Sequence, residues 1–131
     1  MPAMPKITLL FASLHVLLML ALLVPISRHR HAHRIGLGDG GDKALARKIR
    51  VHGNFVEHAP FALLVLALLE LCGLPVFATW TFGGALLLGR ILHAVGMSRS
   101  GGYSIGRFWG TALTWLAFLL MALAGLWLAL R

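Results

Sequence analysis

The sequence predicts an all-α integral membrane protein whose four helices form one bundle. Of its 131 residues, 59% are hydrophobic and only 12% are charged, and the mean hydropathy is +0.84. A soluble domain carries about 25% charged residues, so this chain lacks the polar surface that a water-soluble globule needs. The apolar residues form four runs, each close to the roughly 20 residues with which a helix crosses a bilayer. The apolar content excludes a disordered or collagenous chain, and the single cysteine, Cys72, excludes a disulfide framework.

We expect one domain over residues 1–131, with spans at about 7–26, 54–74, 76–97 and 108–130. The first apolar run is longer than the roughly 7–15 residues of a signal-peptide core, so we expect it to be retained. Asp42 is suited to cap a helix that starts near Lys43 and leads into the second span. The short connection Cys72–Pro75 makes the second and third spans antiparallel neighbours. We expect Cys72 itself to be a packing residue.

Positive charge is concentrated on one side of the predicted spans. The net charge is +8, and seven of the twelve Lys and Arg residues lie in the loop 27–53, with two more in the loop 98–107. The positive-inside rule therefore predicts that both loops are cytoplasmic and that both termini lie outside. Because the aromatic residues lie mainly in the apolar runs, nucleic acid is not an expected partner, whereas anionic membrane lipids are.

Ionisable residues within spans are costly and mark functional sites more often than surface charges do. Two helical stripes that contain such residues are predicted to meet at the cytoplasmic end, because the second and third spans run in opposite directions. The stripe on the second span consists of Arg50, Asn54, Glu57 and His58, and that on the third of Arg90, His93 and Met97. Since Arg50 and Glu57 lie two turns apart, about 10 Å along the axis, we expect them to pair poorly with each other and to seek partners elsewhere. Mutual pairing of charges across the two helices is the alternative.

Other polar or small residues have simpler expected roles. His29 and His33 lie four residues apart, but we expect no carboxylate or cysteine close to them, and the surroundings are positive. We therefore predict no metal site and expect contact with lipid headgroups. We expect Glu70, near the outer turn, to reach water, and the glycines of the third span, including Gly83, Gly84 and Gly89, to permit close helix packing.

The segment from Arg50 to Pro60 has the form R-x-x-x-N-x-x-E-x-x-P. With four spans, a basic first cytoplasmic loop and Arg90 in the third span, the chain resembles the MAPEG family, the membrane-associated proteins of eicosanoid and glutathione metabolism. The glycine-rich run 38–41 before the motif and the run 89–93 after it resemble the bacterial branch. The resemblance covers nearly the whole chain and implies a homotrimer of four-helix protomers, with sites between subunits near the cytosolic face.

The resemblance also implies a glutathione site. The motif residues Arg50, Asn54 and Glu57 match the family's glutathione contacts, and Arg30 is the best match for an arginine of the first loop. His58 stands where some members have tyrosine. Arg90 fits the third span, but His93 and Met97 replace the family's two tyrosines, and methionine donates no hydrogen bond. Arg107 is the nearest equivalent of the arginine that activates the thiol, with Arg99 as the other candidate.

By this resemblance we expect glutathione as co-substrate and a transferase or peroxidase acting on lipophilic electrophiles at the cytoplasmic face of a bacterial inner membrane. A non-catalytic lipid-binding or scaffold protein of the same fold is the alternative, because fold alone does not establish activity. A small multidrug-type transporter is a remote alternative. That class has a similar size but places its essential glutamate in the first span, which here has none.

Overall fold

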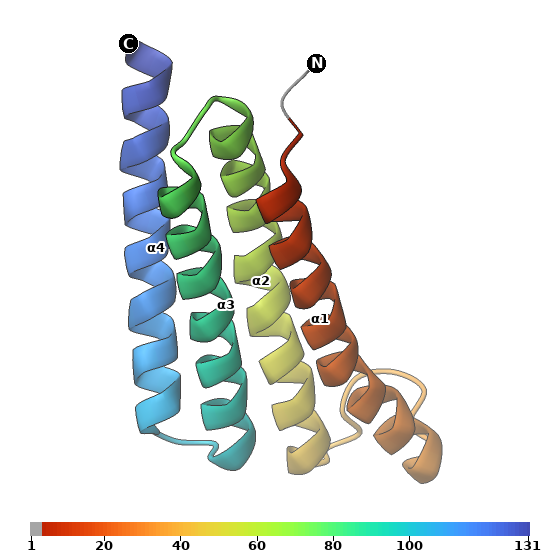
Figure 1. The fold of residues 1–131 in the computed structure, drawn as a ribbon. Helices are drawn as coiled ribbons and strands as arrows, with labels where there is room; N and C mark the ends of the chain where they lie inside the picture. Colours follow the sequence, from red (N-terminus) through yellow and green to blue (C-terminus); the bar gives the residue numbers. More distant parts are fainter. Residues whose placement is uncertain (1–3) are drawn as a thin grey trace.

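The computed structural model describes residues 4–131, which form four long helices and, within that range, no strand. They are α1 (Lys6–His33), α2 (Lys43–Leu71), α3 (Val76–Arg99) and α4 (Ile105–Leu130). The helices lie side by side in chain order, and α1 and α4 do not touch (Figure 1). The predicted four-helix all-α fold is confirmed.

The helices extend beyond the predicted spans at the basic end. α1 continues past Ile26 to His33, so the first long loop shrinks to residues 34–42. As predicted, Asp42 caps α2: one carboxylate oxygen accepts from the backbone N–H groups of Ala44 (2.8 Å) and Leu45 (3.1 Å). At the opposite end, the tight α2–α3 turn passes through Gly73 at φ +84°, a backbone conformation that glycine adopts without strain.

Most large apolar side chains point outward, the reverse of a soluble bundle. In the most apolar 18-residue stretch of each helix, only 17% to 33% of the residues are buried. All four helices are long and apolar enough to cross a membrane. So much outward apolar surface requires a lipid environment, because a soluble protein rarely exposes large contiguous apolar patches. The chain is therefore an integral membrane protein.

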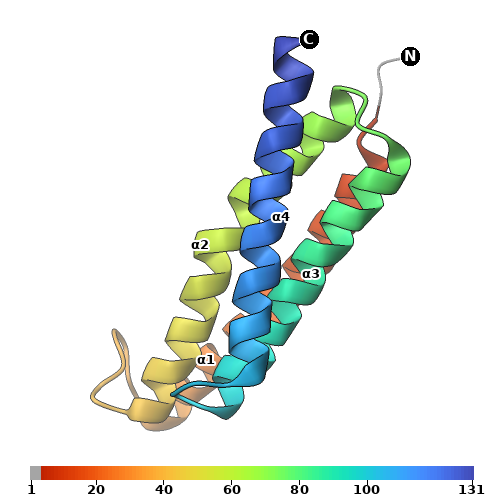
Figure 2. The ribbon, with the colours of Figure 1, turned by 90° about the vertical axis from the view of Figure 1, so that its left-hand side faces the viewer.

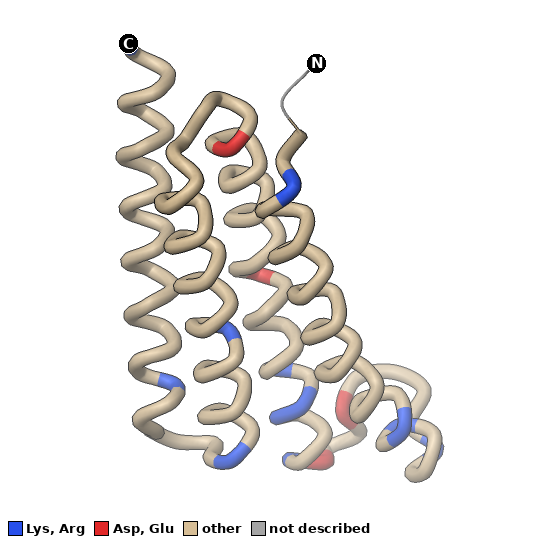
Figure 3. The backbone as a smooth tube through the Cα atoms, in the orientation of Figure 1, with Lys and Arg blue, Asp and Glu red and all other residues tan. Residues whose placement is uncertain are grey.

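The two ends of the bundle differ in charge. The start of α1, the end of α4 and the α2–α3 turn lie at one end, and the two longer connections lie at the other (Figures 1 and 2). Most of the Lys and Arg positions gather toward the end with the longer connections (Figure 3). Glu70, expected to reach water near the outer turn, is partly exposed and also caps a neighbouring helix. Its two carboxylate oxygens accept from the backbone N–H groups of Ile7 (3.0 Å) and Thr8 (2.7 Å), which satisfies donors that the start of α1 leaves unpaired. Cys72 is exposed rather than packed.

Glycines bring α3 against its neighbours. A Cβ atom on Gly89 would lie 2.6 Å from the Thr114 hydroxyl, and one on Gly110 would collide with the backbone of His93, so only glycine allows α3 and α4 to approach this closely. Gly83 likewise accommodates the Phe11 ring of α1. The packing role predicted for these α3 glycines holds for Gly83 and Gly89. It fails for Gly84, where an added Cβ would meet no atom within 4 Å.

Replacing Gly110 with alanine should destabilise the bundle, because the new methyl group would push α4 away from α3. We expect a cost of about 1–3 kcal/mol, the usual range for overpacking a tight contact. The matched control is Gly84→Ala, which adds the same methyl group to open space in a helix and should be neutral or stabilising by up to about 1 kcal/mol. Thermal unfolding in detergent measures both, and equal effects in the two variants would contradict the close α3–α4 contact.

Candidate functional site

A buried arginine joins three helices near the basic end. Arg90 of α3 is only 2% exposed. Its Nη1 donates to Asn54 Oδ1 of α2 at 2.7 Å, and its Nε and Nη2 donate to Thr114 Oγ1 of α4 at 3.1 and 2.8 Å. These acceptors are neutral, and among the described residues no carboxylate lies within 4 Å of the guanidinium. The predicted meeting of the two polar stripes is thus confirmed at the Asn54–Arg90 contact.

The second charged group of the stripe is an ion pair on one helix. Arg50 Nη1 and Nη2 donate to Glu57 Oε1 and Oε2 at 2.9 and 3.1 Å. The expectation that these two residues pair poorly was wrong, because their extended side chains together bridge the two helical turns between their backbones. The side chains remain 56% and 52% exposed. An exposed ion pair of this kind contributes only about 0–1 kcal/mol to stability in water, so a charged ligand can displace either partner at little cost.

The remaining members of the two stripes are partly or fully packed. His58 Nδ1 bonds the Asn54 carbonyl oxygen of its own helix at 2.7 Å, and its ring stacks on Phe118 of α4. His93 is 4% exposed where α3 crosses α4, and Met97 is 8% exposed beside Val51. These two positions therefore serve packing in the isolated chain.

Arg30 and Arg50 share a hollow at the basic end. The hollow has a volume of about 300 Å³ and lies between the end of α1, the loop and the first turns of α2. Arg30 Nε and Nη2 donate to the Gly38 carbonyl oxygen at 3.3 and 3.1 Å, which fixes the guanidinium at the rim. The structure thus brings together two arginines that lie twenty residues apart and were both predicted for one site.

Arg107 lies in a different hollow, of about 380 Å³, at the start of α4. Tyr103 and Ser104 line the same hollow, and Arg107 Nη1 bonds the Gly102 carbonyl oxygen at 3.4 Å. This hollow shares no lining residue with that of Arg30 and Arg50. Within one chain, the residues predicted for a site between subunits therefore fall into three groups: the Arg30–Arg50 hollow, the buried Arg90 group and the Arg107 hollow.

Sequence reasoning missed two residues of this region. Thr114 holds Arg90 from α4, and nothing in a run of apolar residues singles out one threonine as its partner. Tyr103 is the only tyrosine of the chain and is exposed beside Arg107. Its position four residues before Arg107 was a usable signal, since a phenol can donate a hydrogen bond where Met97 cannot.

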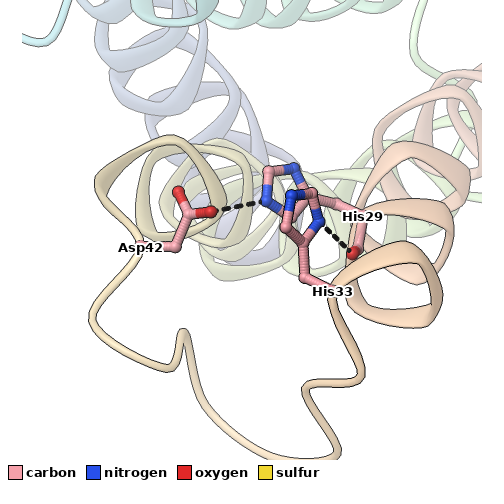
Figure 4. Close-up of side chains that lie close together, drawn as sticks. All are labelled: His29, His33 and Asp42. Carbon is pink, nitrogen blue, oxygen red and sulfur yellow. Dashed lines mark hydrogen bonds and ion pairs between the residues drawn. The ribbon is translucent and has the colours of Figure 1, made fainter.

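The end of α1 is clamped to the start of α2 by a histidine. His29 Nε2 lies 2.8 Å from Asp42 Oδ2, and its Nδ1 lies 3.0 Å from Lys48 Nζ (Figure 4 shows the former contact). Because an ammonium only donates, Nδ1 accepts and Nε2–H donates to the carboxylate. The statement that no carboxylate is near these histidines was wrong, since potential ligand atoms of His29, His33 and Asp42 lie within 4.8 Å of one another. Both ring nitrogens of His29 are nevertheless already engaged, so the cluster acts as a clamp between helices.

Replacing Thr114 with valine should destabilise the bundle, because the buried Arg90 guanidinium loses its α4 acceptor. We expect about 1.5–3 kcal/mol, the usual worth of hydrogen bonds to a charged group. The matched control is Thr111→Val, whose hydroxyl only bonds the Arg107 carbonyl of its own helix. Unfolding in detergent compares the two, and an equally small loss in both would contradict the role of Thr114.

The clamp also predicts a pH dependence at the start of α2. The hydrogen bond from His29, with those from the Leu45 and Ala44 amides, lowers the pKa of Asp42 to about 2 from its ordinary value of 3.8. A depressed carboxyl pKa stabilises the folded state above about pH 4, and this contribution is lost as the pH falls toward 2. The protection of the Ala44 and Leu45 amides against exchange, relative to an unfolded peptide, should therefore fall between pH 4 and 2 in the wild type. In Asp42→Ala, which removes the acceptor, this protection should be low throughout, and a wild-type profile in that variant would contradict the assignment.

Comparison with known proteins agrees with this architecture. A model of the MAPEG family matches residues 8–127. The inner membrane protein YecN of Escherichia coli (strain K12) is 36% identical over 121 residues, which cover 92% of this chain and 91% of YecN. YecN of Escherichia coli O6:H1 (strain CFT073) matches to the same extent. The chain belongs to the MAPEG family.

Proposed function

We propose that this MAPEG protein binds glutathione at its basic end and uses it as co-substrate, as a transferase or a peroxidase acting on lipophilic electrophiles. The observation that carries the proposal is the hollow shared by Arg30 and Arg50, which opens beside the motif helix. Two guanidinium groups at one rim suit the two carboxylates of glutathione, because guanidinium binds carboxylate in a forked geometry. Asn54 and Glu57 continue the row along α2, and the exposed Glu57 carboxylate suits the ammonium of the tripeptide.

The buried Arg90 group supports the same proposal. Its positive charge has only neutral hydrogen-bond acceptors, so the field it creates is not cancelled by a carboxylate of the described chain. The positive field near Arg90 favours an anionic ligand. The hydrogen bond from Arg90 also holds the Asn54 side chain in place for that ligand. His58 and His93 flank this group from α2 and α3, as positioning rather than contacting residues.

The reactive species in this proposal is the glutathione thiolate. A guanidinium next to the sulfur lowers the thiol pKa, and each unit is worth about 1.4 kcal/mol. Arg107 is assigned this role. In the transferase reaction the sulfur forms a bond to the electrophilic carbon while the bond from that carbon to the leaving group breaks. The leaving group departs with the electron pair of that bond, and the thiol proton goes to water. In the peroxidase reaction two thiols reduce a lipid peroxide to an alcohol and water, and a glutathione disulfide is released.

A homotrimer completes the site in this proposal. Arg107 and the Arg30–Arg50 hollow do not adjoin within one chain, and the Arg50–Glu57 pair is exposed on a helix that crosses the membrane. Charged residues on membrane helices usually face a protein interior or a water-filled cavity. Packing of a second copy against this face satisfies that requirement and supplies the missing wall of the site.

A non-catalytic lipid-binding or scaffold protein is the second candidate. Two observations favour it: Met97 and His93 stand in place of the family's tyrosines and are buried in packing, and three of the five N–H groups of the buried Arg90 already donate to Asn54 and Thr114. Such a protein would bind lipophilic molecules between its helices without turnover.

The division of roles predicts separable effects of two arginines. Arg50→Ala should weaken glutathione binding about tenfold or more, because a charged hydrogen-bond partner is worth about 1.5–3 kcal/mol. Arg107→Ala should lower turnover with a general electrophile more than it lowers binding. Calorimetry and a conjugation assay on the detergent-solubilised protein measure both quantities. The control is Arg28→Ala, which removes an exposed charge at the end of α1 outside both hollows.

The possible outcomes separate the candidates. Binding without turnover favours the scaffold protein, and no binding removes glutathione from the proposal. Equal losses of binding and turnover in both arginine variants would contradict the assigned roles.

For the location we propose a bacterial inner membrane, as the name of YecN states for that relative. We propose that the basic end, with the connections 34–42 and 100–104, faces the cytoplasm and that both termini lie outside. A periplasm-dependent alkaline phosphatase should therefore be active when fused after Arg131 and inactive when inserted at Gly102. The opposite pattern would reverse the orientation.

A further inference from the structure

A cavity of about 570 Å³ lies between α1, α2 and the end of α3 at the basic end of the bundle. None of the residues assigned above to glutathione lines it. Its lining has two parts. Cationic side chains come from the first turns of α2, namely Lys43, Arg47 and Lys48, and apolar side chains come from deeper positions, among them Ala21, Leu22 and Val51.

The two parts are arranged along the membrane normal. Lys43 and Val51 are eight residues apart, so about 12 Å of helix separates the outermost charge from the apolar floor. The charged part lies where α2 begins and the apolar part lies against the interior of the spans. A phospholipid has the same arrangement, with a phosphate at the surface and acyl chains below it.

The cationic part of the cavity has no carboxylate partner. The whole sequence has four Asp and Glu residues. Asp42 pairs with His29, Glu57 pairs with Arg50, and Glu70 and Asp39 bind backbone N–H groups. Within residues 4–131, none lies within 4 Å of the three cations of the cavity, and Lys48 Nζ contacts His29 Nδ1 at 3.0 Å instead.

The apolar wall also provides a backbone acceptor. Pro25 lies inside α1 and lines the cavity, and proline has no N–H group. The carbonyl oxygen of Ala21, one turn earlier, therefore lacks its helical donor.

We propose that this cavity is a binding site for an anionic phospholipid of the surrounding bilayer. The phosphate lies among Lys43, Arg47 and Lys48, and one acyl chain follows Leu22 and Val51 toward the bilayer. Charge complementarity selects an anionic over a zwitterionic headgroup, and the apolar floor selects a lipid over free phosphate. A lipid bound there would stabilise the packing of α1 against α2 next to the His29–Asp42 contact, and its binding would not depend on glutathione.

Native mass spectrometry of the delipidated full-length protein in detergent tests the proposal, with dioleoyl phosphatidylglycerol as the probe. Phosphatidylglycerol adducts should form at lower lipid concentration than phosphatidylcholine adducts. The double variant Lys43→Gln, Arg47→Gln should weaken phosphatidylglycerol binding about tenfold or more, since each Lys or Arg near an anionic surface contributes about 1 kcal/mol. Ala44→Phe and Ala21→Phe keep the charge but fill the cavity from exposed positions, and should weaken binding to a similar extent.

The matched charge control is the double variant Arg28→Gln, Arg34→Gln, whose side chains lie at the end of α1 outside this cavity and which should bind like the wild type. Circular dichroism and gel filtration confirm that each variant is folded. Three results would overturn the proposal: equal binding of phosphatidylcholine, an equal loss in the charge control, or full binding in both phenylalanine variants. Displacement of the lipid by glycerol phosphate alone at equal concentration would overturn the role of the acyl chain.

Discussion

The basic half of this bundle depends on the burial of one arginine. Arg90 is held by an amide of α2 and a hydroxyl of α4, so it fixes three helices relative to one another inside a membrane-spanning bundle, where a buried charge is costly. Burying a charge without an acceptor would cost several kcal/mol, and this cost constrains both Asn54 and Thr114. Close approach of α3 and α4 through Gly89 and Gly110 is what brings the Thr114 hydroxyl within reach. The close packing of α3 and α4 is thus a condition for the hydrogen bonds that stabilise the buried charge.

The same packing divides the polar groups into those that are hydrogen-bonded in the interior and those that remain accessible at the surface. Arg90 and Asn54 bond each other in the interior, whereas Arg50, Glu57 and Arg30 remain at the surface beside a hollow. Exposed charges on an apolar bundle need either water, a ligand or another copy of the chain. In our proposals, glutathione and the neighbouring copies of a trimer supply partners for Arg30, Arg50 and Glu57. A bound phospholipid on the other face of α2 supplies a partner for Lys43 and Arg47.

Much of this could be predicted from the sequence. The long apolar runs were enough to predict the four helices. Asp42 was enough to predict the start of α2, because helix capping depends on local sequence. The contact between Asn54 and Arg90 followed from helical spacing in an antiparallel pair. Three contacts could not be predicted because they depend on side-chain reach or on the approach of helices in space: the Arg50–Glu57 pair, the backbone capping by Glu70, and the Asp42–His29 contact. The division of the predicted residues between separate hollows could not be predicted. Residue spacing shows which side chains share one face of a helix, but it does not show how the helices and loops pack around a cavity.

The central claim is that copies of this chain share a glutathione site at their basic end. Its most direct test is a native mass spectrum of the detergent-solubilised protein recorded with and without glutathione. The account predicts a mass of three chains and the addition of up to three glutathione molecules per complex. A monomer that gains no glutathione at saturating concentration would contradict it.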